Sequence, residues 1–225
     1  MSDERSPARE AAAAAAVELV EEGTVIGLGS GRAVWRVVEL LAGAQVQAVV
    51  ASERTRGAAE KAGIEVVELD GRVRPVLALD GADEVDGSLR LIKGGGGALL
   101  REKIVVAASE RFVVVAEAAK KVERLGSGFR LPVEVVRFAW EDTARRLAVV
   151  LPEPELRSEG GEPYVTDEGH YILDCAIPDG SDLNALDVDL RRVPGVVEHG
   201  LFVGLAERAL LGTPDGGVEV LRAEG

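Results

Sequence analysis

Short apolar runs alternate with helix-forming segments along the first 117 residues of the chain. The segment 7–21 holds strong helix formers and no helix breaker after Pro7, so it predicts a helix, and 33–41 and 55–62 predict two more. The apolar runs have the length of strands and lie at 24–29, 46–51, 64–69, 75–80 and 111–117. Continuous apolar strands separated by helices predict a parallel sheet with helices on both faces.

The pattern changes near residue 130. The later segments predict, in order, a strand at 131–138, a helix at 140–150, extended segments at 164–167 and 171–177, a helix at 183–192 and a strand at 196–201. This β-α-β-β-α-β order is typical of the split ferredoxin-like arrangement. We therefore predict an α/β fold with two domains: a Rossmann-like parallel sheet domain formed by residues 1–129 plus 203–225, and a smaller ferredoxin-like α+β domain at 130–202.

Charge and cysteine content narrow the class of protein. The chain has 26 Lys and Arg against 39 Asp and Glu, a formal charge of −13. That charge argues against nucleic acid or an anionic membrane as the partner. Cys175 is the only cysteine and lies in an apolar segment, so we expect a buried thiol and a reducing, cytoplasmic environment. His170 falls in a predicted turn, where an exposed side chain is expected.

A glycine-rich stretch, GLGSGR (27–32), follows the first predicted strand and opens a helix. In that position backbone N–H groups and the helix dipole can bind phosphate. The stretch lacks the spacing of a dinucleotide fingerprint and the GK[ST] of a P-loop. A tight turn and an anion site therefore both remain open.

A second stretch, LDGADEVDG (79–87), begins at the end of a predicted strand, where ligands of α/β sheets bind. Asp80 and Asp83 share one short loop, and close carboxylates can separate their pKa values for acid–base work. A magnesium site is a competing interpretation. A turn rich in Asp and Gly is a third, and Glu84 and Asp86 are expected to be turn residues.

A third stretch, LIKGGGGALLREKI (91–104), contains four consecutive glycines. Glycine lets the backbone approach a ligand closely. A helix is expected from Ala98 onward, with Leu100, Ile104 and Ala107 as an apolar stripe and Glu102 nearly opposite it. Glu102 could equally be a solvated helix residue.

Lysine is scarce and concentrated near this stretch. The chain has 21 Arg and 5 Lys, and the four lysines other than Lys61 lie between residues 93 and 121. A lysine beside a glycine loop, in a chain that prefers arginine, favours a role for its compact charge. Lys103 and Lys121 could still be surface residues.

Taken together, the motifs resemble the ribose-5-phosphate isomerase A family. The matching segments occur in order over nearly the whole chain: GLGSG, LDGADEVDG, KGGGGALLREKI, LPVEVV, VPGVV followed by GLF, and GTPDG. The resemblance implies interconversion of D-ribose 5-phosphate and D-ribulose 5-phosphate without cofactor or metal. It also implies a homodimer or a dimer of dimers, with a sugar phosphate as the partner.

The resemblance assigns roles to residues of this chain. Glu102 would move a proton between C1 and C2, Asp80 would assist the transfer between O1 and O2 with support from Asp83, and Lys93 with the glycine amides would stabilise the enediolate. The substrate-binding set that it implies is Arg9, Gly29, Ser30, Gly31, Arg32, Ala33, Gly81, Ala82, Gly94, Gly95, Gly96 and Lys120.

The chain departs from the family at two places. The family usually has Thr-Gly-Ser-Thr where Ser30-Gly31-Arg32-Ala33 stands, so two hydroxyls that could bind phosphate are missing. A guanidinium at Arg32 could replace them, because its geometry suits phosphate. Arg9 stands about where the family often has a lysine.

Two other functions are open alternatives. CoA transferases share a related α/β architecture and use a glutamate nucleophile, but the DGAD loop favours the isomerase. Sugar-phosphate sensors of transcription regulators use related domains, but this chain shows no basic recognition helix.

Overall fold

The larger sheet of the protein has seven strands and is mostly parallel. The computed structural model describes residues 6–222, and in it the strand order is β16-β15-β7-β4-β1-β2-β3, with only β16 antiparallel to its neighbour. The strands are β1 (Val25–Leu28), β2 (Gln47–Val50), β3 (Glu65–Val66), β4 (Leu77–Asp80), β7 (Phe112–Glu117), β15 (Arg208–Gly212) and β16 (Val218–Arg222). The predicted parallel sheet is confirmed, and the C-terminal segment returns to it beside β7.

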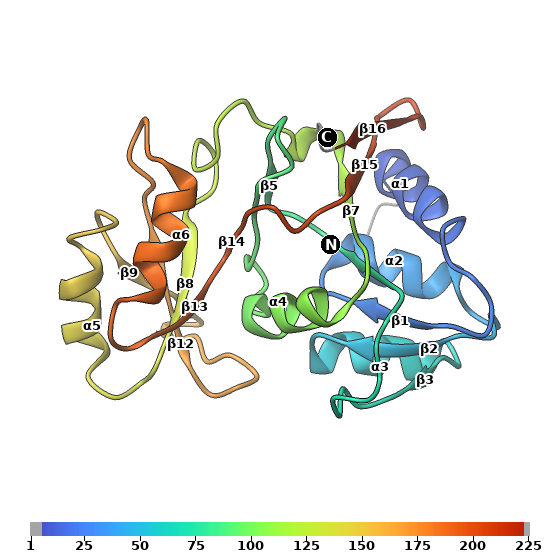
Figure 1. Ribbon diagram of the computed structural model, residues 1–225, viewed down its shortest axis with the longest axis horizontal. Coiled ribbons are helices and arrows are strands. Elements are labelled where there is room, and N and C mark those ends of the chain that lie inside the picture. Colours follow the sequence, from blue (N-terminus) through green and yellow to red (C-terminus); the bar gives the residue numbers. More distant parts are fainter. Residues whose placement is uncertain (1–5, 223–225) are drawn as a thin grey trace.

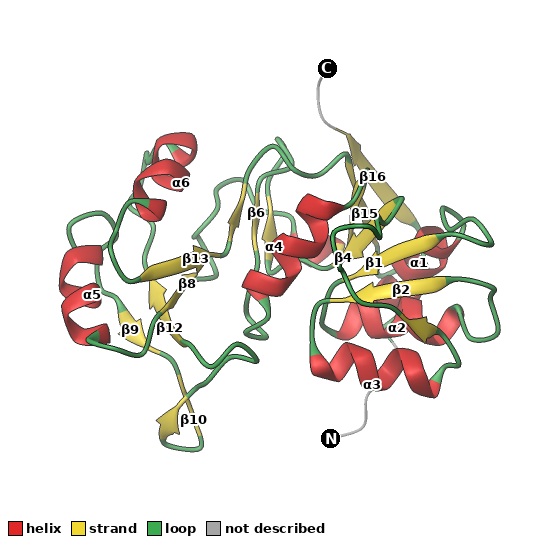
Figure 2. Cartoon of the chain, turned by 60° about the horizontal axis from the view of Figure 1, so that its bottom comes forward, coloured by secondary structure: helices red, strands yellow, loops and turns green. Residues whose placement is uncertain are grey.

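Helices cover both faces of this sheet. On one face pack α1 (Pro7–Val17), α2 (Arg32–Leu40) and α3 (Glu53–Lys61), and on the other packs α4 (Leu99–Ala108). Figure 2 shows α2 and α3 across the sheet from α4. The first helix ends at Val17, earlier than the predicted 21.

Side chains alternate between the two faces along each strand, which decides what α4 meets. Leu77 and Leu79 of β4 join the core beneath α1 and α2, whereas Ala78 belongs to the core on the opposite face. Asp80 has the same parity as Ala78 and therefore faces the side of α4. The alternation thus brings Asp80 toward Glu102, although 22 residues separate them in the chain.

The smaller sheet is antiparallel, with strand order β13-β8-β12-β9. In chain order these are strands 4-1-3-2 of the ferredoxin-like arrangement, so the predicted topology is confirmed. Helices α5 (Trp140–Leu147) and α6 (Leu183–Arg191) lie on its outer side (Figure 1). The strands are β8 (Leu131–Val135), β9 (Glu155–Leu156), β12 (Tyr171–Cys175) and β13 (Val196–His199). Cys175 is fully buried there, as expected.

One strand of the smaller sheet was predicted at the wrong place. Residues 164–167 do not form a strand; the second strand is β9, and a short hairpin of β10 (Ser158–Glu159) and β11 (Glu162–Pro163) follows it. The Tyr164 hydroxyl instead donates to the Gly96 carbonyl, and the Thr166 hydroxyl donates to the carboxylate of Glu134 on β8. Side-chain contacts with residues far apart in the chain therefore decide the conformation at 164–167.

A small third sheet, β14-β6-β5, lies between the two larger sheets (Figure 1). It pairs β14 (Leu201–Phe202) with β6 (Leu91–Ile92), next to β5 (Glu84–Val85), and a short 3₁₀ turn, η1 (Ala118–Lys120), follows β7. The domain limits expected at 129/130 and 202/203 stay predictions, and residues 1–5 and 223–225 lie outside the described residues. Within residues 6–222, no helix has the length and apolar character to cross a membrane.

Candidate active site

A cavity of about 830 Å³ opens where the parallel strands β1 and β4 end. The loops after these strands form part of its wall, as expected for ligand sites of α/β sheets. The hairpin of β10 and β11 forms another part of the wall. The predicted site residues on the wall are Arg9, Ser30–Ala33, Gly81–Asp83, Lys93–Gly96, Glu102 and Lys120. The structure therefore brings together all the predicted site residues except Gly29 and Asp80, which do not line the cavity.

Lys93 is the centre of the charged groups in this cavity. Its Nζ lies 2.8 Å from Asp80 Oδ2 and 3.3 Å from Glu102 Oε2, and it donates a hydrogen bond to the Gly81 carbonyl oxygen at 2.7 Å. Burial would lower the pKa of Lys93, but the carboxylates of Asp80 and Glu102 raise it above its ordinary value. Lys93 is therefore a buried ammonium ion.

Asp80 lies behind Lys93. Only 1% of its side chain is exposed, and its Oδ1 accepts hydrogen bonds from the backbone N–H groups of Gly81 at 2.7 Å and Ser30 at 3.2 Å. A Cβ on Gly29 would stand 1.9 Å from the Asp80 carboxyl carbon. Gly29 thus serves the close packing of Asp80 against the backbone after β1.

Glu102 reaches the cavity from the first turn of α4. Its side chain is 5% exposed, and its Oε2 receives no hydrogen bond from residues 6–222. Burial, followed by the nearby carboxylate of Asp80, raises the pKa of Glu102 to about 8 against the effect of Lys93.

One ammonium group cannot neutralise two buried carboxylates, so one of them holds a proton near neutral pH. Burial also raises the pKa of Asp80, while Lys93 and the two N–H groups of Gly81 and Ser30 lower it. These contacts are shorter and more numerous than those of Glu102. We therefore assign the ionised form to Asp80 and the proton to Glu102 in the ligand-free protein.

The prediction of which face of α4 is buried was wrong. The stripe of Leu100, Ile104 and Ala107 does not face the core, because Ile104 is 50% exposed and Ala107 is exposed as well. The opposite face is buried instead and contains Leu99, Glu102, Lys103, Val105 and Val106. Hydrophobic spacing misled here because two of the buried residues are charged.

The glycine loop, Gly94–Gly97, turns from β6 into α4. The N–H of Gly95 donates to Asp83 Oδ2 at 2.7 Å, and the N–H of Gly97 donates to the Gly94 carbonyl at 3.0 Å. Asp83 thus holds the loop and lines the cavity. Asp80 and Asp83 engage different partners, Lys93 and Gly95. No group of three or more His, Cys, Asp or Glu in the described part of the chain is placed to bind a metal.

The loop after β1 is fixed from below by hydroxyl groups. Ser30 Oγ lies 3.0 Å from Ser52 Oγ, and Thr55 Oγ1 donates to the Gly29 carbonyl at 2.8 Å. The indole N–H of Trp35 donates to the same Thr55 hydroxyl at 3.1 Å. Arg32 begins α2 and is exposed at the cavity wall.

On the other side of the cavity lie Arg9 and Lys120. Arg9 Nε donates to Glu117 Oε1 at 3.1 Å, so the α1 side chain is tied to the end of β7. Lys120 follows in η1. Cationic side chains therefore approach the cavity from both sides.

The sequence did not reveal several lining residues. Arg54 is the second residue of α3 and stacks its guanidinium 3.7 Å above the Trp35 ring. Arg157 and Tyr164 reach the cavity from the two ends of the β10–β11 hairpin. None of them belongs to a glycine- or aspartate-rich motif, so no local signal marked them. Ser52, Arg54 and Thr55 stand after β2, and the end of that predicted strand was the one available indication.

Other polar residues proved to be structural. Glu84 is buried and accepts hydrogen bonds from the N–H groups of Gly126 and Gly128, both at 2.6 Å. Asp86 is buried as well and accepts from Arg90 Nε at 2.6 Å. Glu84 is therefore not the turn residue that was expected. Asp86 is one, because its Oδ1 also accepts from the Ser88 N–H at 2.9 Å and its carbonyl oxygen accepts from the Leu89 N–H at 3.1 Å.

His170 also differs from its prediction. Its Nδ1 lies 2.9 Å from the buried Glu134 Oε1, and the imidazole is 26% exposed. It is therefore a partly buried partner of a carboxylate, not an exposed turn residue.

The fold and the cavity define an α/β enzyme with buried acid–base groups beside a glycine loop. The family model described as Ribose 5-phosphate isomerase A (phosphoriboisomerase A) matches residues 47–216. This chain belongs to that family and is an isomerase.

Individual relatives cover nearly the full length. Ribose-5-phosphate isomerase A of Gloeobacter violaceus is 49% identical over 219 residues, 95% of each chain. The crystal structure of ribose 5 phosphate isomerase A from Neisseria gonorrhoeae superposes with a TM-score of 0.90 at 37% identity, over 96% of each chain. A D-ribose-5-phosphate isomerase in complex with phospho-erythronic acid has a TM-score of 0.89 at 31% identity, over 95% of this chain and 97% of that one. These likenesses favour the isomerase over the acyl transferase and the sensor.

Proposed function

We propose that the protein interconverts D-ribose 5-phosphate and D-ribulose 5-phosphate through an enediolate, with Glu102 as the base that moves the proton. The arrangement of Glu102, Lys93 and Asp80 carries this proposal, because a raised-pKa carboxyl stands 3.3 Å from a buried ammonium ion at the cavity wall. Family membership supplies the substrate.

The reaction needs a base that moves a proton between the adjacent carbons C1 and C2, and a cation beside the oxygen that gains negative charge. Glu102 acts in its ionised form, and because its pKa is about 8 a fraction of the protein carries the free carboxylate near neutral pH. In the forward direction this carboxylate removes the proton from C2 of the open-chain aldose. The electron pair of that C–H bond forms the C1–C2 double bond, and the C1 carbonyl oxygen becomes the negatively charged oxygen of the enediolate. The same carboxyl then delivers the proton to C1, while a proton passes from O2 to O1. A base whose pKa lies near the working pH serves this transfer well.

Positive charge at the enediolate oxygen lowers the barrier. Lys93 is held in place by Asp80 and Gly81, so it needs little rearrangement as charge develops on the substrate. A preorganised donor of this kind is worth about 3–4 kcal/mol. The amides of the glycine loop and the first turn of α4 add further donors beside Lys93.

The two aspartates divide their work according to position. The resemblance gives the proton transfer between O1 and O2 to Asp80, with Asp83 in support. Asp83 lines the cavity, whereas Asp80 lies behind Lys93. We therefore propose the reverse division: Asp83 meets the substrate oxygens, and Asp80 acts by holding Lys93.

The phosphate end of the substrate lies among the cationic side chains in this proposal. Arg9, Arg32 and Lys120 reach the cavity from α1, α2 and η1. A phosphate there accepts charge-assisted hydrogen bonds from guanidinium groups. Homodimer or dimer-of-dimers assembly and a cytoplasmic location remain further parts of the proposal.

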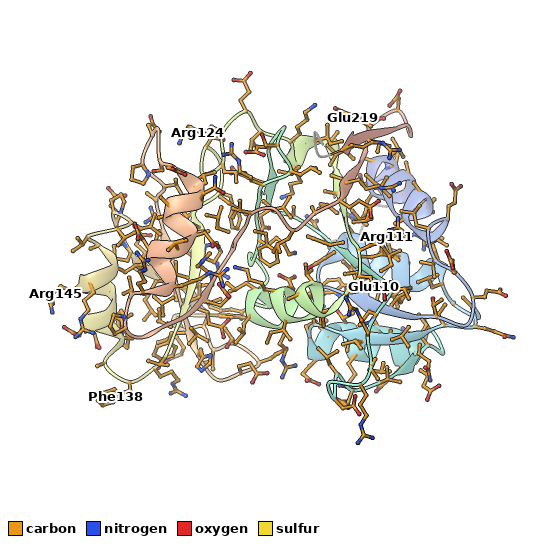
Figure 3. All side chains as sticks on the ribbon, viewed as in Figure 1. Glu110, Arg111, Arg124, Phe138, Arg145 and Glu219 are labelled. Atoms are coloured by element: carbon orange, nitrogen blue, oxygen red, sulfur yellow. The ribbon has the colours of Figure 1, made fainter. Side chains whose placement is uncertain are left out.

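The decisive experiment adds ribose 5-phosphate to purified protein in the presence of EDTA and follows ribulose 5-phosphate. We expect turnover in the wild type and none measurable in Glu102→Gln, because the amide cannot accept the proton. Glu110→Gln is the matched control, since Glu110 lies just past the end of α4 and is exposed (Figure 3).

Two results would count against the proposal. Near-wild-type kcat in a folded Glu102→Gln variant would remove Glu102 as the base. Turnover that disappears with EDTA would contradict a reaction free of metal and revive a cation at Asp80 and Asp83.

A further inference from the structure

The glycine loop cannot hold its own shape. Glycine has more backbone freedom than any other residue, and four in succession lose the most order when nothing restrains them. Within the loop there is a single internal hydrogen bond, from the Gly97 N–H to the Gly94 carbonyl. A loop that must present N–H groups at fixed positions therefore requires ties from elsewhere.

Arg157 supplies two of these ties. Its Nη1 donates to the Gly94 carbonyl oxygen at 2.7 Å and to the Gly95 carbonyl oxygen at 3.3 Å. Arg157 lies between β9 and β10, 62 residues after Gly95 in the sequence. One guanidinium therefore holds two successive carbonyl groups of the loop.

Asp174 fixes Arg157 in turn. The carboxylate of Asp174, on β12, accepts from both Nε and Nη2 of Arg157, with the Nε contact at 2.9 Å. The two side chains are only 14% and 21% exposed. A bidentate pair of this kind fixes the plane of the guanidinium, so Nη1 is aimed at the loop.

Tyr164 completes the contact from the same side. Its hydroxyl donates to the Gly96 carbonyl at 3.2 Å, and its ring occupies the space where a Cβ of residue 97 would be. Gly97 has φ +81°, and a Cβ there would lie 2.2 Å from the Tyr164 hydroxyl oxygen. Tyr164 thus leaves room only for glycine at position 97.

These ties decide where the loop N–H groups point. The peptide bonds are trans, so the N–H of each unit points opposite to its carbonyl. Arg157 draws the Gly95 carbonyl to one side and leaves the Gly96 N–H on the other. That N–H has no partner among residues 6–222 and remains a free donor.

We propose that Arg157, aligned by Asp174 and assisted by Tyr164, is a positioning residue that presents the glycine-loop amides to the reacting end of the substrate. This inference rests on the proposed function, in which those amides stabilise the enediolate. Arg157 contacts neither Lys93 nor Glu102 by any hydrogen bond or ion pair of the described residues, so it acts through the loop.

The test compares Arg157→Leu, Arg157→Lys and Tyr164→Phe in the full chain. We expect kcat to fall about 10- to 100-fold in Arg157→Leu with KM changed less than threefold, because misplaced donors affect the transition state most. Arg157→Lys restores part of the loss, since lysine can reach one carbonyl but cannot pair bidentately with Asp174. Tyr164→Phe, which keeps the ring and loses one hydrogen bond, shows a smaller fall.

Arg130→Leu is the matched control. Arg130 also donates to backbone carbonyls, including Asp174 O at 3.1 Å, but among the hydrogen bonds of residues 6–222 it makes none to the glycine loop. Hydrogen–deuterium exchange of residues 93–98 gives a readout independent of turnover. Faster exchange there is expected in Arg157→Leu and not in Arg130→Leu.

Each outcome has a definite meaning. Unchanged kcat and unchanged loop exchange in Arg157→Leu overturn the positioning role, as does an equal kcat loss in Arg130→Leu. If Arg157→Leu does not fold, wild-type kcat and loop exchange in both Arg157→Lys and Tyr164→Phe overturn it equally. A wild-type protein that does not isomerise ribose 5-phosphate refutes the proposed function instead. Hydrogen–deuterium exchange of the loop then still tests whether Arg157 holds the glycine loop.

Discussion

At the scale of single residues, the raised pKa of Glu102 makes the free energy of unfolding depend on pH. A buried carboxyl whose pKa is about 8 holds a proton in the folded protein over a pH range in which the unfolded chain has released it. Between about pH 4.5 and 8 the native state therefore binds more protons than the unfolded state. The free energy of unfolding must fall as pH rises through this range.

This sign gives a prediction for Glu102→Gln. The glutamine amide does not titrate in this pH range, so the free energy of unfolding of the variant does not fall for this reason. Relative to the wild type, its free energy of unfolding should increase between pH 5 and pH 8, by on the order of a few kcal/mol. Urea denaturation at several pH values measures the difference. Parallel pH profiles for the two proteins would show that Glu102 does not carry a raised pKa.

A second residue-scale prediction concerns Arg32, which stands where the family usually has a hydroxyl. Arg32→Ala should raise KM for ribose 5-phosphate about 10-fold or more and change kcat little, because a guanidinium–phosphate contact is made in ground and transition states alike. Steady-state kinetics check this, with Arg124→Ala as the control, since Arg124 pairs with Asp179 away from the cavity. An unchanged KM would make Arg32 a surface residue.

At the scale of elements, two adjacent residues of helix α4 make contacts in different places, one at the cavity and one at β13 and β14. Glu102 points to the cavity, while the Lys103 Nζ donates to the carbonyl oxygens of His199 at 2.7 Å and Leu201 at 3.0 Å, and pairs with Glu198 at 2.9 Å. Burial lowers the pKa of Lys103 to about 8, against the effect of Glu198. This lysine thus joins α4 to β13 and β14.

The Lys103 contacts are also linked to Lys93 through the backbone. The Gly200 carbonyl, between the two carbonyls that Lys103 holds, accepts from the Lys93 N–H at 2.8 Å. We predict that Lys103→Met lowers the free energy of unfolding by about 2–3 kcal/mol, because it leaves buried carbonyls unpaired.

The control for this prediction is Lys121→Met. Lys121 is 40% exposed and pairs with Glu219 on the surface, so its loss should cost less than about 1 kcal/mol. Urea denaturation of both variants measures the difference. Equal losses would mean that burial of Lys103 contributes nothing beyond a surface ion pair.

At the scale of the whole molecule, the loop at 164–168, which contributes Tyr164 and Asp167 to the cavity wall, is tied to helices α3 and α4. Arg101 of α4 pairs with Glu168 at 2.6 Å and Glu53 at 2.8 Å, and Asp167 Oδ2 accepts from the Glu53 N–H at the start of α3. Asp167 also lines the cavity. These contacts fix the loop at 164–168 beside the cavity.

Because these ion pairs are partly exposed, salt should weaken them. Arg101→Ala is expected to change the free energy of unfolding by less than about 1 kcal/mol but to raise KM several-fold at low ionic strength. The KM ratio of variant to wild type should approach one at 0.5 M NaCl, because the wild type then also loses the contact. Arg111→Ala, which removes an ion pair with Glu207 elsewhere, is the control. A ratio independent of salt would contradict an electrostatic attachment of this loop.

Most of the architecture could be predicted from local patterns. The parallel strands were recognisable because they are apolar throughout and buried on both faces. The failures occurred where a tertiary partner outweighs local spacing. Residues 164–167 form no strand, and the hydroxyls of Tyr164 and Thr166 donate to Gly96 and Glu134. Helix α4 buries Glu102 and Lys103 while its apolar Ile104 faces outward.

The sequence by itself determined the chemical groups of the site: the glycine loop, Asp80 and Asp83 at a strand end, and a lysine in a chain that favours arginine. These are local, because turn chemistry and strand ends are written in adjacent residues. Only the tertiary structure decided that Asp80 lies behind Lys93, that Glu102 keeps its proton, and that Arg157 holds the glycine loop. Burial and distance set those properties, and both arise from residues that are far apart in the chain.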